Sequence, residues 1–184
     1  MSLGEARAVA ERLDAAEAPD SALDLDELGG GAGIGASERN RAMAEAAPPP
    51  GADAETLARF LTTRGVARRA VGRYGDSVAD LRQARELALK TKTLDVSLIA
   101  HELYNSLDRT GRFGETLVAA QEFFDTVPAG DQERVANYAR QYSRVMALAG
   151  RLKEAEIGVK RAETAAATLA ARRGRGASAP RAQI

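Results

Sequence analysis

The sequence predicts an all-α fold of stacked helix–turn–helix repeats, an α-solenoid with flexible segments at both ends. The main observation is a recurring triplet, which occurs as Gly72-Arg73-Tyr74, Gly111-Arg112-Phe113 and Gly150-Arg151-Leu152, each 39 residues after the last. A constant period of this length is the signature of a repeat protein. Apolar residues around each triplet follow offsets of three and four, as on one face of a helix. All eight aromatic residues lie between Phe60 and Tyr142, where a packed core is therefore expected.

The N-terminal segment, residues 1–52, is rich in Ala, Gly and acidic residues. We expect short helices over residues 3–17 and 36–47. The glycine-rich stretch GAGIGA at residues 31–36 is interpreted as part of a flexible linker. The stiff Pro48-Pro49-Pro50-Gly51 then marks the boundary of the folded domain, and Asp53 is expected to cap its first helix.

The folded domain is expected to span residues 53–171, in three repeats at about 55–92, 93–130 and 131–171. One helix precedes each triplet and another follows it, which gives six helices. A small residue near the start of each second helix allows close packing, and these residues are Ser77, Thr116 and Ala155. Because one helix pair cannot bury its apolar face alone, the repeats should share a continuous core. The side chains expected in this core are Phe60, Leu61, Ile99, Leu103, Tyr104, Leu107, Tyr142, Val145 and Met146.

The pattern resembles the tetratricopeptide repeat (TPR), a helix–turn–helix unit whose turn carries Gly-x-Tyr/Phe/Leu. Gly65 stands at the family's small-residue position in the first helix, and Pro128 ends the second repeat where the family often has Pro. The resemblance covers roughly residues 55–171, in three matches at constant spacing. It implies a right-handed superhelix whose first helices line a concave, ligand-binding surface.

The chain departs from the family in several respects. Its period is 39 residues, against about 34 in the family, so either the second helices or the links between repeats should be longer. Arg64 and Arg68 stand where large apolar residues are common, so that face of the first helix is expected to be less well buried. Ser143 stands in the third repeat where Gly65 stands in the first.

The resemblance implies a peptide-binding groove formed by outward positions of the three first helices. Within each helix these positions follow offsets of three and four, so they form one stripe. Asn105 can both donate to and accept from an extended peptide backbone, and the arginines suit carboxylates. The full set is Arg59, Thr62, Val66 and Arg69 in the first repeat, Leu98, His101, Asn105 and Asp108 in the second, and Asn137, Arg140 and Arg144 in the third.

Some TPR proteins hold a terminal carboxylate with a clamp of Lys and Asn residues, and we do not expect that activity here. Asn105 resembles a clamp amide. Thr62, Val66 and Glu102, however, occupy other positions where the clamp needs Lys or Asn. The opposite interpretation of the whole stripe, as a merely solvated helix face, remains open.

Composition argues against several other functions. The 26 basic and 26 acidic residues cancel, whereas a general nucleic-acid binder usually carries a large positive excess. The absence of Cys excludes thiolate metal sites, and the single His101 is expected to be an exposed helix-surface residue. We therefore expect no enzyme activity, no cofactor and no metal. No apolar run approaches the length of a membrane span and no signal-peptide pattern is present, so we expect a cytoplasmic protein without nucleic-acid or membrane partners.

The function predicted from these observations is a non-catalytic scaffold that binds an acidic protein segment in the TPR-like groove. One alternative is a sensor or regulatory TPR module of a larger signalling or transcription-regulating protein. A remote alternative is an enzyme that binds a nucleotide through GAGIGA, which loosely matches the dinucleotide fingerprint but lacks its βαβ context.

The flanks carry two further expectations. Residues 21–28, SALDLDEL, alternate Leu with Asp and could occupy the groove of their own chain or of a neighbouring copy. The alternative is an acidic lead that contacts nothing. Residues 172–184 hold four arginines and no acid, and are expected to form a basic, disordered tail. The identity of the partner and the oligomeric state, including a homo-oligomer, stay open.

Overall fold

A computed structural model describes residues 34–177, which contain seven helices and no strand. The chain divides after Glu38 into two compact units, and the description below concerns the second, Arg39–Ile184, within the described range. The helices are α3 (Ile34–Glu45), α4 (Ala54–Ala70), α5 (Tyr74–Thr91), α6 (Val96–Asp108), α7 (Phe113–Thr126), α8 (Gln132–Leu148) and α9 (Leu152–Ala177).

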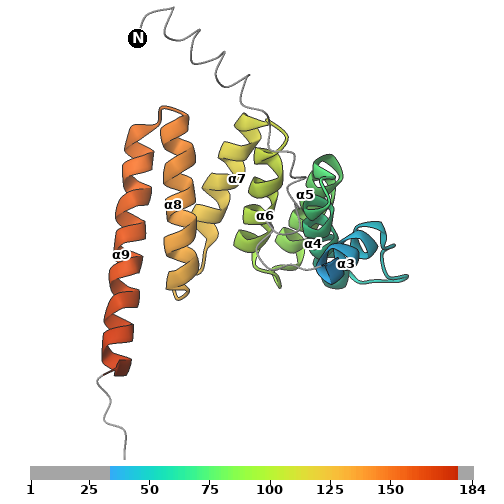
Figure 1. The fold of residues 1–184 in the computed structure, drawn as a ribbon, viewed down its shortest axis with the longest axis horizontal. Coiled ribbons are helices and arrows are strands. Elements are labelled where there is room, and N and C mark those ends of the chain that lie inside the picture. The colour runs from blue at the N-terminus through green and yellow to red at the C-terminus, as the bar shows by residue number, and fades with distance from the viewer. Residues whose placement is uncertain (1–33, 178–184) are drawn as a thin grey trace, which may run out of the picture. The chain divides into compact units, whose positions relative to one another are not determined.

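Helices α4 to α9 pack in the order in which they occur in the sequence (Figure 1). The closest pairs are α4 with α5, α6 with α7, and α8 with α9, and each pair also packs against the next. The predicted all-α fold and the six helices between residues 53 and 171 are thus confirmed. The last of the six is longer than expected, because it continues to Ala177.

The three turns within the pairs occur at the three repeated glycines. Gly72, Gly111 and Gly150 have φ angles of 81°, 70° and 73°, in the left-handed region that favours glycine. The first and third turns close in the same way. The amide after the glycine donates to a helix carbonyl five residues back, from Arg73 to Arg68 at 2.8 Å and from Arg151 to Met146 at 2.9 Å.

Each of the first helices, α4, α6 and α8, begins at an aspartate cap. Asp53, the predicted cap, accepts a hydrogen bond from the Thr56 amide at 2.7 Å, and Asp95 and Asp131 cap α6 and α8. The Arg134 guanidinium donates to the carboxylates of both Asp95 and Asp131. The starts of the second and third pairs are therefore joined by charge as well as by packing.

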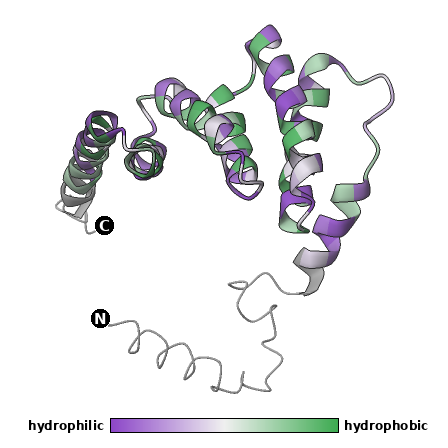
Figure 2. Cartoon of the chain, turned by 90° about the horizontal axis from the view of Figure 1, so that it is seen from above, coloured by the Kyte–Doolittle hydropathy of each residue, from purple (hydrophilic) through white to green (hydrophobic). Residues whose placement is uncertain are grey.

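The predicted core is confirmed with one qualification. Eight of the nine expected side chains are buried, and they form one cluster that runs through all three pairs. Phe60 is half-buried, with the Arg64 guanidinium 5.0 Å from its ring centroid. Every helix from α4 to α9 mixes hydrophobic and hydrophilic residues, as expected when each has one buried face (Figure 2).

Small residues set the spacing within the first pair. A Cβ atom on Gly65 would lie 2.8 Å from Leu81 Cγ, so any larger residue would push α4 and α5 apart. The buried Ser77 hydroxyl donates to the Gly65 carbonyl at 2.6 Å and contacts the Ser106 hydroxyl of α6 at 2.8 Å. Three consecutive helices thus meet at one buried polar contact.

The third pair reaches the same closeness with the glycine on the other helix. Ser143 replaces Gly65 on the first helix, and Gly158 on α9 takes over the role of the small residue. A Cβ on Gly158 would lie 2.9 Å from the Ala139 carbonyl and would collide with the Ser143 hydroxyl. This exchange explains how Ser143 is tolerated at the position where the first repeat has Gly65.

The expectation that Arg64 and Arg68 leave one face of α4 poorly buried is wrong. Their side chains are only 13% and 16% exposed, because both pair with the buried carboxylate of Asp80 at 2.8 Å. Arg64 Nη1 also donates to the Ala46 carbonyl and Arg68 Nε to the Ala44 carbonyl, at the end of α3. The two arginines therefore fix residues 44–46 against the first pair.

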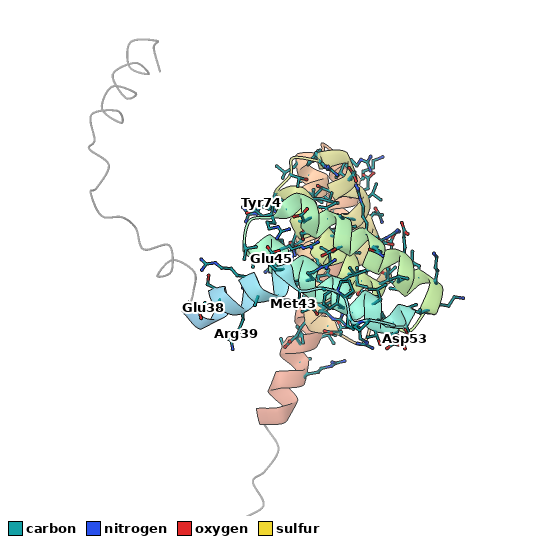
Figure 3. All side chains as sticks on the ribbon, turned by 90° about the vertical axis from the view of Figure 1, so that its right-hand side faces the viewer. Glu38, Arg39, Met43, Glu45, Asp53 and Tyr74 are labelled. Atoms are coloured by element: carbon teal, nitrogen blue, oxygen red, sulfur yellow. The ribbon has the colours of Figure 1, made fainter. Side chains whose placement is uncertain are left out.

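Figure 3 shows this end of the unit, with Glu45 at the end of α3, Asp53 at the start of α4 and Tyr74 at the start of α5. Arg73, next to Tyr74, forms an ion pair with Glu45. The last residues of α3 thus contact α4 and the α4–α5 turn through charged side chains.

Two expectations concern segments at the edge of the described range. Helix α3 begins at Ile34, so residues 34–36 of GAGIGA are helical rather than linker. Likewise, α9 covers residues 172–177, so this part of the predicted disordered tail is helical. The expected helix over residues 3–17 and the acidic segment at residues 21–28 lie outside the described residues.

The close approach of α4 and α5 predicts that Gly65→Leu lowers the free energy of unfolding by on the order of 1–3 kcal/mol, because the new side chain overpacks the contact with Leu81. Chemical denaturation monitored by circular dichroism measures this change. Gly114→Leu is the matched control, since Gly114 lies in α7 with open space around it. Equal effects of the two substitutions would show that the Gly65 contact does not limit packing.

The Asp80 cluster predicts that Asp80→Ala destabilises the fold by about 3–5 kcal/mol, because it leaves two largely buried guanidinium groups without their carboxylate. Thermal or urea unfolding gives the value. Asp76→Ala, also on α5 but exposed, should change stability by less than about 1 kcal/mol. A loss at Asp80 no larger than that at Asp76 contradicts a structural role for the cluster.

Candidate functional site

The residues expected to line a groove lie on α4, α6 and α8, and contacts between these helices show that their stripes adjoin. Arg69 of α4 pairs with Glu102 of α6. From α8, Arg144 donates to the Tyr104 hydroxyl of α6 at 3.1 Å. The first helices of the three pairs therefore form one continuous face, which we call the inner-helix face.

A cleft of about 600 Å³ opens on this face between α4 and the start of α6. Three of the expected residues, Arg59, Thr62 and Leu98, line it. Its walls combine apolar and hydroxyl-bearing side chains with two charged ones, and the other lining residues are Thr63, Thr93, Leu94, Asp95 and Ile99. A cleft of this kind suits an aliphatic side chain of a bound segment, with the hydroxyls near its backbone.

A second cleft, of about 300 Å³, includes Val66 and Arg69 of the expected set. Ala70, Tyr74 and Arg109 complete its lining. The four expected residues of α4 are thus divided between two clefts, two in each.

The expectation that His101 is an exposed surface residue is wrong. Its side chain is 14% exposed and stacks on the Tyr138 ring, with centroids 4.5 Å apart. Nε2 lies 3.1 Å from the Gln141 amide oxygen, and the ring edge faces Phe123. His101 therefore belongs to the aromatic contact between α6 and α8, and leaves little surface for a ligand.

The arginines of α4 are also less available than expected. Arg59 pairs with Glu55 of its own helix at 2.7 Å, and Arg69 pairs with Glu102 across to α6. Burial acts to raise the pKa of Glu102, but the nearby His101 ring and the charge of Arg69 outweigh it, so the pKa lies below its ordinary value. Glu102 thus remains a carboxylate that holds Arg69 in place.

Two arginines further along α8, Arg140 and Arg144, differ, because their hydrogen-bond partners are neutral. Arg140 is exposed and donates to the Asn137 amide oxygen at 3.1 Å. Arg144 is also exposed, and it donates to the Tyr104 hydroxyl. This hydrogen bond is the main reason that the pKa of Arg144 is raised, and the negative charge of Asp108 raises it further. Two guanidinium groups, one helical turn apart, therefore face solvent from this part of the inner-helix face.

The remaining expected residues lie around these two arginines. Asn105 is half-buried, with Nδ2 3.5 Å from His101 Nδ1. Asn137 is half-buried and Asp108 is exposed. The side chains of Asn105, Asn137, Arg140 and Arg144 thus offer amide and guanidinium donors along adjoining turns of α6 and α8.

Sequence reasoning missed the residues that join the stripes to one another. Tyr104 is buried in the core as predicted, but its hydroxyl also reaches Arg144. Gln141, which lies outside the predicted stripe, contacts His101. The repeat period could have indicated both contacts. The contacts His101–Gln141 and Tyr104–Arg144 each join residues 40 apart, about one repeat period, so equivalent turns of neighbouring repeats meet.

No known protein family matches this chain, and neither characterised proteins nor solved structures gave a match. Within residues 34–177, no group of three or more His, Cys, Asp or Glu side chains is arranged to hold a metal ion. Among the described helices, none has the length and apolar character needed to cross a membrane.

The lowered pKa of Glu102 predicts an acid-dependent loss of stability. Since the folded-state pKa lies below the ordinary 4.5, the contribution is present above about pH 4.5 and is lost as the pH falls through the folded-state value. Glu102→Gln should therefore lose less stability than the wild type between pH 5 and about pH 3. Urea unfolding of both proteins at each pH measures this difference. Parallel curves for Glu102→Gln and the wild type contradict the assignment.

Proposed function

We propose that the chain is a non-catalytic scaffold of the TPR-like α-solenoid type, whose inner-helix face binds an acidic, extended protein segment. In this proposal Arg140 and Arg144 bind carboxylates of the segment. The cleft between α4 and α6 accepts an aliphatic side chain, and the amides of Asn105 and Asn137 bind its backbone.

The observation that carries the proposal is the contrast between the arginines of this face. Arg59 and Arg69 have carboxylate partners within the chain, whereas the hydrogen-bond partners of Arg140 and Arg144 are neutral. An exposed guanidinium pair with neutral partners fits an incoming carboxylate without first breaking an ion pair. In this proposal the cleft between α4 and α6 supplies an apolar contact that charge alone does not provide.

The proposal predicts that Arg140→Glu combined with Arg144→Glu weakens binding of an acidic peptide at least about tenfold, or about 1.4 kcal/mol. The probe is a fluorescent peptide of sequence SALDLDEL, and its isosteric control is SALNLNQL. Fluorescence anisotropy with the full chain gives both affinities. Because the contact is exposed, raising the salt concentration should weaken binding of the acidic probe more than that of the control.

A control variant separates site charge from net charge. Arg151→Glu with Lys153→Glu makes the same change in net charge at the start of α9, where added acids also suit the helix dipole. This variant should bind the acidic probe peptide with most of the wild-type affinity. If it weakens binding as much as the α8 variant does, or if both peptides bind equally well, the inner-helix face is not the site.

A further inference from the structure

Helix α9 carries an apolar stripe with the spacing of a helix–helix contact, which we call the α9 stripe. Its residues follow alternating offsets of three and four, and they are Leu152, Ala155, Val159, Ala162, Ala166 and Leu169. Over 18 residues the stripe is about 25 Å long at 1.5 Å per residue. This surface is distinct from the inner-helix face and does not depend on the proposed function.

The repeat period identifies the residues of α5 and α7 that are equivalent to those of the α9 stripe. Shifted by 39 and 78 residues, Val159 corresponds to Ala120 of α7 and Leu81 of α5. Both of those residues are 0% exposed, whereas Val159 is 45% exposed. At the position of Ala166, the corresponding Val127 and Ala88 are buried, while Ala166 is exposed.

These positions differ in exposure because α5 and α7 are each covered by the next helix in the sequence. Helix α6 packs against α5 and α8 packs against α7, whereas within residues 34–177 the helix that packs closely on α9 is α8 (Figure 1). Gly158 faces α8. Within the stripe, Ala155 is buried and Ala162 and Leu169 are half-buried. The exposed members are Leu152, Val159 and Ala166. The natural complement of the α9 stripe is therefore another α-helix.

The helix of a second copy that would extend the stack is α4, but its equivalent face is already occupied. Arg64 and Arg68 lie there, paired with the buried Asp80 and bonded to the carbonyls of Ala44 and Ala46. Stacking α9 on this face would bury these charges against apolar residues, which is costly. The α9 stripe of a second copy carries no such charges, and its exposed members are the apolar Leu152, Val159 and Ala166.

We propose that two copies of the chain associate through their α9 stripes, antiparallel about a two-fold axis between Val159 and Ala162. This arrangement sets Val159 of one protomer opposite the partner's Ala162, and Leu152 opposite the partner's Leu169. Such a two-fold contact is closed and cannot grow into a filament. One helix pair buries less than the roughly 800 Å² per partner of a standard interface, so the dimer is weak and depends on concentration.

Analytical ultracentrifugation of the full chain over a concentration series tests the proposal. The mass of the wild type should rise from 19.4 kDa towards twice that value. Val159→Lys should weaken association at least tenfold. Ile157→Lys is the matched control, because Ile157 is also an exposed β-branched residue of α9, 56% exposed, but lies on a different face from the stripe. It should associate as the wild type does.

Cross-linking tests the predicted geometry, which is simple because the chain has no Cys. Under mild oxidation, a mixture of the Val159→Cys and Ala162→Cys chains should form disulfide-linked dimers. A mixture of Ile157→Cys and Ala162→Cys should form far fewer. A wild type that stays monomeric at the highest concentration, equal weakening by the two Lys substitutions, or equal cross-linking in the two mixtures would each overturn the proposal.

Discussion

Each helix pair of this chain has an apolar face that it cannot bury alone, and the order of the fold follows from covering that face. Helix α6 covers α5, and α8 covers α7. Covering requires close approach, which small residues permit: Gly65 against Leu81 in the first pair, and Gly158 against Ser143 in the third. The glycine changes helix between repeats, so the constraint is the short distance between the two helices rather than the residue at one position.

The sequence period was enough to predict the helices, their turns and most of the core. Gly72, Gly111 and Gly150 recur at a fixed spacing because each adopts a left-handed φ angle. Side-chain pairing was not predictable in the same way, since it depends on how neighbouring helices rotate about their axes. Thus Arg64 and Arg68 look like defects in an apolar pattern until Asp80 is found between them. The sequence predicts an exposed His101, whereas in the structure the Tyr138 ring stacks on it.

The arginines of the inner-helix face show how far the candidate site was predictable. The TPR resemblance selects Arg59, Arg69, Arg140 and Arg144 as groove positions, and the structure has them on α4 and α8, two of the three first helices. The resemblance could not distinguish the arginines held by carboxylates of the chain from those bonded to neutral groups. Contacts between residues one period apart carry that information, because equivalent turns of successive repeats are neighbours in space.

The central claim is that stability comes from stacking neighbouring pairs, so a helix pair covered on both sides should be held most firmly. Native-state amide hydrogen exchange of the full chain, at low protein concentration and resolved by helix, measures this directly. The account predicts the slowest exchange in α6 and α7 and faster exchange in α4 and α9. Within residues 34–177, the pairs that contain α4 and α9 each stack on another pair on one side only. Slowest exchange in α9, or one uniform rate from α4 to α9, would contradict it.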